Sequence, residues 1–130
     1  MKGIAILGAT GSVGESTLDV VARHPARFRV VALGAQRNAA RLAEQALRFR
    51  PEVAALADPD AARELAATLA RAGSVTRVVA GDEAMAGIAT LPGVDYVMAA
   101  IVGAAGLPST LAAARAGKRV LLANKESLVM

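Results

Sequence analysis

Three glycines near the amino terminus, Gly8, Gly11 and Gly14, are spaced as in a loop that binds phosphate groups. They follow the apolar run 4–7, which is typical of a strand, and they precede a segment with helical periodicity. The free N–H groups and the dipole of a helix start favour an anion at this place. Gly8 can form the turn, Gly11 can admit a pyrophosphate, and Gly14 can let the helix pack closely on the strand. The pattern predicts a dinucleotide site, and the alternative is an ordinary structural turn.

A second loop, expected over residues 34–38, carries the side chains that would choose between cofactors. In dinucleotide folds that prefer NAD, an acidic residue near this position binds the ribose 2′-hydroxyl. No acidic residue occurs between Asp19 and Glu44, and the loop offers Arg37 and Asn38 instead. A guanidinium forms charge-assisted hydrogen bonds with a phosphate, so the sequence predicts NADP rather than NAD. The alternatives are that Arg37 is simply a solvated residue and that Asn38 caps the next helix.

Polar residues also follow the last expected strand, over residues 118–123. Asn124, Lys125 and Glu126 put an amide, an ammonium and a carboxylate side by side at its carboxyl end, where ligands sit in doubly wound sheets. We expect them to face the same ligand, and the alternative is a helix cap at Asn124 with solvated neighbours. The small residues 103–106 follow the preceding strand, and they are expected either to wall the same crevice or only to form a turn.

Apolar runs and helical segments alternate along the whole chain. Strands are expected over residues 4–7, 28–33, 53–56, 75–80, 95–102 and 118–123, and helices over 12–23, 38–50, 58–73, 82–90 and 108–117. This alternation predicts an α/β fold, namely a doubly wound, mostly parallel sheet with helices on both faces, of the Rossmann-like type. For 130 residues we expect one domain with one core.

The composition argues against several other classes of protein. Hydrophobic residues make up 55% of the chain and aromatic residues only 2%, so small branched side chains must fill the core. The net charge is +4, but the basic residues are dispersed without aromatic platforms, which argues against nucleic acid as a partner. The sequence has no cysteine, no secretory signal and no apolar run long enough to span a membrane, so we expect a cytoplasmic location. The only histidine, His24, is expected at a helix end rather than in catalysis.

Several of these segments resemble the 1-deoxy-D-xylulose 5-phosphate reductoisomerases. The resemblance rests on the glycine loop, on residues 15–21 and 98–107, and above all on residues 121–129. It implies an enzyme of the non-mevalonate isoprenoid pathway, which rearranges and reduces 1-deoxy-D-xylulose 5-phosphate, a phosphosugar, to 2-C-methyl-D-erythritol 4-phosphate. The resemblance also implies NADPH as the reductant and, for the full-length enzyme, a divalent Mn, Mg or Co ion and a homodimer.

The same resemblance implies roles for individual residues. The candidate cofactor-binding residues are Gly8, Thr10, Gly11, Ser12, Val13, Gly34, Gln36, Arg37, Asn38, Ala100, Asn124 and Glu126. Residues 10–13 would hold the pyrophosphate, residues 37 and 38 the 2′-phosphate, and residues 124 and 126 would lie near the reduced ring. Lys125 would reach the substrate, and no catalytic residue or metal ligand is assigned in this chain.

Two features depart from the family pattern. Gln36 and Arg37 stand where the family commonly has glycine and lysine. This difference affects the detail of the phosphate contact, but the side chain at position 37 remains positively charged. Asn124 and Glu126 also fit the cap and first turn of a helix, of which only residues 127–130 follow. We therefore expect the NADPH-binding domain alone, without the metal-binding, catalytic and C-terminal domains, and inactive by itself.

Two other classes of protein share such a glycine loop. Short-chain oxidoreductases need a tyrosine with a lysine four residues later, and here the only tyrosine, Tyr96, has Ala100 at that position. Their proton-transfer chemistry is therefore absent. A stand-alone module that binds or senses NADP(H) without catalysis remains as the alternative.

Overall fold

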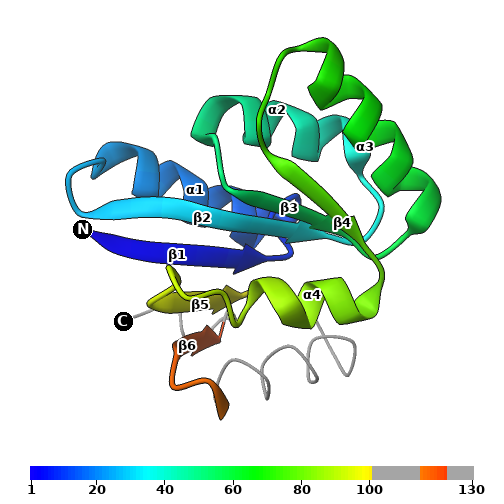
Figure 1. Cartoon of the computed structure of the whole chain (residues 1–130). Helices are drawn as coiled ribbons and strands as arrows, with labels where there is room; N and C mark the ends of the chain where they lie inside the picture. Colours follow the sequence, from blue (N-terminus) through cyan, green and yellow to red (C-terminus); the bar gives the residue numbers. More distant parts are fainter. Residues whose placement is uncertain (101–114, 123–130) are drawn as a thin grey trace.

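The computed structural model describes residues 1–100 and 115–122, in which strands and helices alternate (Figure 1). The strands are β1 (Lys2–Leu7), β2 (Phe28–Ala35), β3 (Val53–Leu56), β4 (Arg77–Ala80), β5 (Tyr96–Ala99) and β6 (Arg119–Leu122). The helices are α1 (Ser12–Arg23), α2 (Ala39–Phe49), α3 (Pro59–Arg71) and α4 (Asp82–Ile88). No helix within these two ranges combines the length and the apolar character needed to cross a bilayer.

The six strands form one sheet in the order β4-β3-β2-β1-β5-β6. Every described pairing is parallel, so the carboxyl ends of the strands lie at one edge, toward which the arrowheads of β1 and β2 point in Figure 1. The chain runs outward from β1 to β4 and then returns to β5 on the other side of β1. This reversal creates the switch point at which doubly wound sheets bind ligands. The predicted fold class is confirmed.

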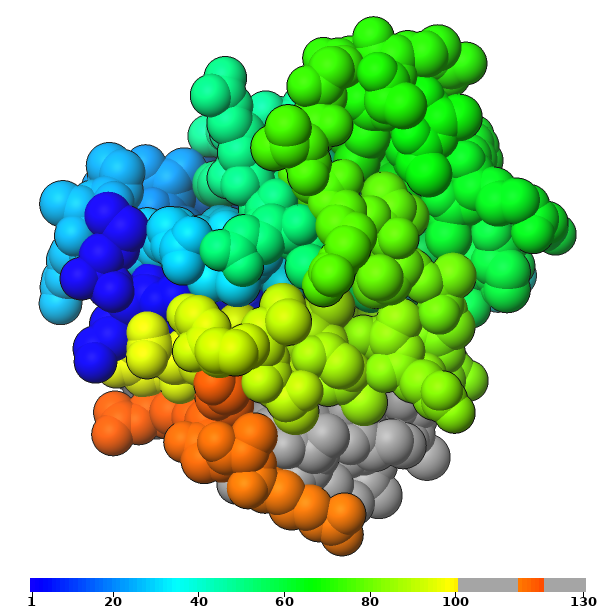
Figure 2. Space-filling view, viewed as in Figure 1, coloured from blue at the N-terminus to red at the C-terminus, as the bar shows by residue number. Residues whose placement is uncertain are grey.

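Helices cover both faces of the sheet, as predicted. On one face, α1, α2 and α3 contribute Leu18, Leu42 and Leu65 to a buried apolar cluster. On the other face, α4 contributes Met85 and Ile88 to a second cluster. Figure 2 shows this second face, where the yellow-green to yellow surface that includes α4 crosses the middle of the molecule. The buried apolar residues are all aliphatic or methionine, which agrees with the low aromatic content.

Capping signals in the sequence mark helix ends correctly. The Asp58 side chain caps α3 by accepting a hydrogen bond from the Ala61 amide (3.3 Å), and Pro59 is the first residue of that helix. His24 is the last, capping position of α1, and its amide donates to the carbonyl of Val21 (3.0 Å). The helix-end position of His24 agrees with the expectation from the sequence, and aspartate followed by proline is typical of a helix start.

Strand ends differ from the sequence expectation. Strand β2 was expected to stop at residue 33, but Gly34 and Ala35 also belong to it because they pair with Ala55 and Leu56 of β3. Strand β4 starts at Arg77 instead of residue 75, since its register partner β3 begins only at Val53. Helix α4 ends at residue 88 rather than 90, and β5 and β6 are described over four residues each.

The start of α1 packs directly on the loop before it. A Cβ atom added to Gly14 would lie 2.2 Å from the carbonyl oxygen of Gly8 and 2.6 Å from the Cα of Ala9. Both neighbours are backbone atoms, which cannot move aside as the end of a side chain can. Gly14 therefore allows the close approach that the sequence predicted for it.

We expect Gly14→Ala to destabilise the protein by about 1–3 kcal/mol, because overpacking against backbone forces a shift of the helix or the loop. Gly87→Ala is the matched control, since Gly87 lies near the end of α4 with no atom of residues 1–100 or 115–122 within 4 Å of an added Cβ. The control is expected to be neutral or to gain up to about 1 kcal/mol. Chemical denaturation of the three proteins measures the difference, and equal stabilities of the two variants would contradict this account.

Candidate functional site

The candidate site lies at the carboxyl ends of β1, β2 and β5. Strand β1 has β2 on one side and β5 on the other, and each of the three strands delivers a different segment to this edge. The loop after β1 is residues 8–11, called here the first loop, and the loop after β2 is residues 36–38, called the second loop. Ala100 follows β5, and its amide donates to the carbonyl of Leu7 at 2.8 Å. The topology thus brings the three predicted segments together.

The first loop is anchored to the end of β2. Gly8 has φ of +85°, a left-handed conformation that favours glycine, so it forms the predicted turn. The amides of Gly8 and Ala9 both donate to the carbonyl oxygen of Gly34, each at 2.8 Å. Gly34 itself is buried, and an added Cβ would lie 2.8 Å from the end of the Met85 side chain. A side chain at Gly34 would therefore require the Met85 and Ile88 side chains to shift, and the backbone carbonyl of this residue anchors the first loop.

The amides at the start of α1 are open. Within residues 1–100 and 115–122, the amides of Thr10, Ser12 and Val13 donate to no backbone acceptor outside the helix, and the helix-capping residue Gly11 supplies no side-chain cap. A Cβ added to Gly11 would have only an ordinary contact, 3.5 Å from the carbonyl oxygen of Gly8. Gly11 is exposed. Packing within the described residues therefore does not require glycine there, whereas close approach of an external group would require it.

The second loop presents exposed polar side chains on a fixed backbone. Gln36 accepts a hydrogen bond from the amide of Asp58 (2.9 Å) through its carbonyl, and the Asn38 side-chain oxygen caps α2 by accepting from the amide of Arg41 (3.1 Å). The capping alternative for Asn38 is thus confirmed, and its side-chain amide nitrogen has no partner in the described part of the chain. Arg37 is exposed and makes no ion pair with any described residue.

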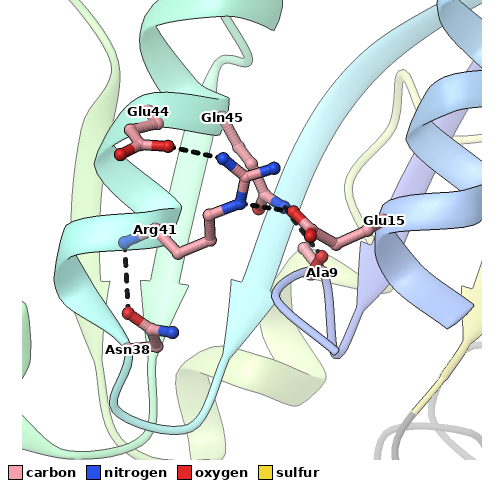
Figure 3. A network of polar contacts seen from close by, with 6 residues as sticks. All are labelled: Ala9, Glu15, Asn38, Arg41, Glu44 and Gln45. Atoms are coloured by element: carbon pink, nitrogen blue, oxygen red, sulfur yellow. Dashed lines mark hydrogen bonds and ion pairs between the residues drawn. The ribbon is translucent and has the colours of Figure 1, made fainter. Parts of the chain in front are cut away.

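A polar network that the sequence prediction missed connects α1, α2 and the first loop (Figure 3). Arg41 pairs with Glu15 of α1 and with Glu44 on its own helix. Gln45 of α2 donates to the carbonyl of Ala9 (2.8 Å) and to the carboxylate of Glu15 (3.0 Å). The sequence contained one signal of this network, because the polar residue Gln45 falls on the apolar side of α2, three residues after Leu42.

The network lowers the pKa of the Glu15 carboxyl below its ordinary value. The hydrogen bond from Arg41 is the main cause, and partial burial acts in the opposite direction. The hydrogen bond from Gln45 adds to the lowering. Glu15 is therefore a carboxylate near neutral pH, and its charge, at the start of α1, is balanced by the guanidinium of Arg41.

Three predicted site residues lie outside the described residues: Asn124, Glu126 and Lys125. The same holds for the small-residue loop 103–106. In the described part of the chain, no three His, Cys, Asp or Glu side chains gather as a metal site would require. The described site therefore consists of a loop with open amides next to an exposed guanidinium, an arrangement suited to a ligand with separate phosphate groups.

Comparison with known proteins places this geometry in a family. A family model described as 1-deoxy-D-xylulose 5-phosphate reductoisomerase matches residues 4–130. The reductoisomerase of Paraburkholderia xenovorans is 60% identical over 129 residues, which cover 99% of this chain and 32% of the relative. The chain thus spans about a third of the length of the curated relatives it matches.

Solved structures of such enzymes have the same fold. The Zymomonas mobilis reductoisomerase in complex with NADPH superposes with a TM-score of 0.88 at 48% identity, over 98% of this chain and 33% of that one. A reductoisomerase in complex with NADPH, fosmidomycin and magnesium superposes with a TM-score of 0.91 at 50% identity, over 100% of this chain and 32% of that one.

Replacing Arg41 by methionine is expected to raise the pKa of Glu15 toward its ordinary value, because the main cause of the lowering is removed. In the native protein the lowered pKa stabilises the fold above the ordinary pKa, and this contribution disappears as the pH falls through the lowered value. The stability advantage over Arg41→Met should therefore be present at pH 7 and lost in acid.

An NMR titration of the Glu15 carboxyl carbon measures this shift. Arg63→Met is the matched control, since Arg63 pairs with Asp60 on α3, remote from Glu15. The control should leave the Glu15 titration unchanged. An unchanged titration in Arg41→Met would show that the Glu15–Arg41 contact does not form in solution.

Proposed function

Since the chain belongs to the 1-deoxy-D-xylulose 5-phosphate reductoisomerase family, we propose that it is the NADPH-binding portion of such an enzyme. The observation that carries the proposal is the set of open amides of Thr10, Ser12 and Val13, next to the loop that carries the exposed Arg37. The first can hold a pyrophosphate and the second a 2′-phosphate. The NADPH complex of the Zymomonas mobilis relative supports the choice of ligand.

Each segment at the sheet edge has a separate task in this proposal. Thr10, Ser12 and Val13 bind the pyrophosphate through backbone N–H groups, and Gly11 leaves room for it. Arg37 recognises the 2′-phosphate, while Gly8, Gly34, Gln36, Asn38 and Ala100 shape the surrounding surface. By the family resemblance, Asn124 and Glu126 lie near the nicotinamide and Lys125 reaches the substrate.

The reaction proposed for the complete enzyme is the rearrangement and reduction of 1-deoxy-D-xylulose 5-phosphate to 2-C-methyl-D-erythritol 4-phosphate. NADPH, when bound, supplies the hydride. This chain binds and orients the cofactor, and the phosphosugar and a divalent metal ion belong to the complete enzyme. The magnesium bound in a structural relative supports the metal, and the resemblance alone supports the homodimer. The cytoplasmic location is proposed from the composition of the sequence, which has no cysteine.

The alternative, a module that senses NADP(H) without catalysis, is not favoured. Its only support was the glycine loop, which both classes share, whereas the match to the reductoisomerase family extends over residues 4–130.

Replacing Arg37 by alanine is expected to weaken NADPH binding about ten- to a hundredfold, because a charge-assisted hydrogen bond contributes about 1.5–3 kcal/mol. NADH lacks the 2′-phosphate, so its affinity should change little. Isothermal titration of the protein with both cofactors measures the ratio.

Arg71→Ala is the control for the Arg37 test. Arg71 is also exposed, but it is the last residue of α3 and lies at the opposite edge of the sheet. Its replacement should change neither affinity. Equal losses for NADPH and NADH in Arg37→Ala would mean that this side chain only supports the loop.

The 130-residue chain is expected to bind NADPH without metal-dependent turnover, because it spans about a third of its relatives. Supplying the remaining portion of a relative should restore oxidation of NADPH when phosphosugar and Mn are present, as followed by absorbance of the reduced cofactor. Product formation by this chain alone would refute the assignment to a cofactor-binding portion, and failure of restoration would favour the sensing module.

A further inference from the structure

Gln45 is a buried polar residue on the apolar side of α2. Its side chain is 4% exposed, and it lies in the same buried set as Leu42 and Ala46 of the same helix. Its amide nitrogen donates to the carbonyl oxygen of Ala9 in the first loop (2.8 Å) and to Glu15 (3.0 Å), as Figure 3 shows. Both partners are acceptors, so the amide nitrogen must face them and the amide oxygen must face away.

The bond to Ala9 determines the direction of the next amide. The carbonyl of Ala9 and the N–H of Thr10 belong to one planar trans peptide, in which the two groups point in opposite directions. Because Gln45 of α2 holds the carbonyl, the Thr10 N–H is turned away from α2. This is one of the open amides of the first loop.

Packing alone does not explain a glutamine at this position. Its amide oxygen Oε1 is buried without a hydrogen-bond partner among the described residues, which costs stability. An apolar side chain would avoid this cost. Gln45 is also held from the other side, since Arg41 fixes the Glu15 carboxylate that Gln45 contacts. The protein thus keeps a glutamine whose unpaired amide oxygen costs stability, while its amide nitrogen donates to the backbone of the first loop.

We propose that Gln45 is a positioning residue for phosphate binding, which fixes the Ala9–Thr10 peptide so that the Thr10 N–H faces the pyrophosphate. This inference rests on the proposed function, because it assumes that the first loop binds the pyrophosphate of NADPH. It assigns to Gln45 no contact with the cofactor. The consequence is that losing Gln45 weakens binding of the pyrophosphate and not of the 2′-phosphate.

The test compares two ligands on Gln45→Met, which keeps the length of the side chain and removes its donors. NADPH affinity should fall about five- to tenfold, the loss of roughly one neutral hydrogen bond. Adenosine 2′-monophosphate carries no pyrophosphate, and its affinity should stay unchanged. In NMR spectra, addition of NADPH should shift the Thr10 amide signal strongly in the native protein and much less in the variant.

Thr76→Val is the matched control for a lost buried hydrogen bond. The Thr76 hydroxyl donates to the carbonyl of Pro51 (2.7 Å), is also buried, and lies before β4 at the opposite edge of the sheet. This variant should lose stability without changing the affinity for either ligand. If Gln45→Met does not fold, Gln45→Leu, which suits a buried helix position, replaces it in the same comparison.

Each outcome separates this inference from the proposed function. If the native protein fails to bind NADPH, the proposed function is wrong and the inference falls with it. If the native protein binds NADPH but Gln45→Met binds it equally well, or weakens both ligands equally, only the positioning role is overturned. A selective loss of NADPH affinity, with a diminished shift at Thr10, supports that role.

Discussion

The carbonyl oxygen of Gly34 accepts hydrogen bonds from two successive amides, those of Gly8 and Ala9, and the rest of the site depends on this contact. It ties the loop after β1 to the last residues of β2, so that the backbones of the two loops that carry the polar groups are joined directly. The Met85 and Ile88 side chains of α4 fill the space beside Gly34, and a side chain there would require these side chains to shift. A helix on one face of the sheet thus packs against the residue that anchors the first loop.

Electrostatics imposes a second constraint on the same loop. A carboxylate in the first turn stabilises a helix through the helix dipole, but it also repels an anion bound at the helix start. Glu15 is in that position on α1. Arg41, from the first turn of α2, pairs with it and partly offsets its charge, since the same guanidinium also pairs with Glu44, and Asn38 accepts a hydrogen bond from the backbone amide of Arg41. The start of α2 therefore follows the second loop directly, and it also supplies the guanidinium that pairs with the Glu15 carboxylate near the first loop.

The sequence predicts most of the fold because its signals are local. Asp58 and His24 mark helix ends by their chemistry, and an apolar run marks each of the six strands, although most strand ends differ by one or more residues. Where the prediction failed, the local structure depends on contacts with residues that are distant in the sequence. Gly34 was assigned to a loop by its residue type, yet pairing with β3 makes it part of a strand. Gln45 was overlooked because periodicity identifies buried faces but cannot say which backbone carbonyl a buried amide meets.

The three glycines of the motif, at positions 8, 11 and 14, are present for different physical reasons. Gly8 is required by its positive φ, and Gly14 by the backbone atoms that lie 2.2–2.7 Å from an added Cβ. Both demands come from the fold itself, and any protein with this strand, turn and helix would share them. Gly11 differs, since a Cβ there would meet nothing closer than 3.5 Å among the described residues and its φ is negative. The described part of the fold tolerates a side chain at Gly11, and the proposed reason for glycine is a group that approaches the open amides on either side. Of the three, Gly11 is the one whose conformation and packing point to a ligand.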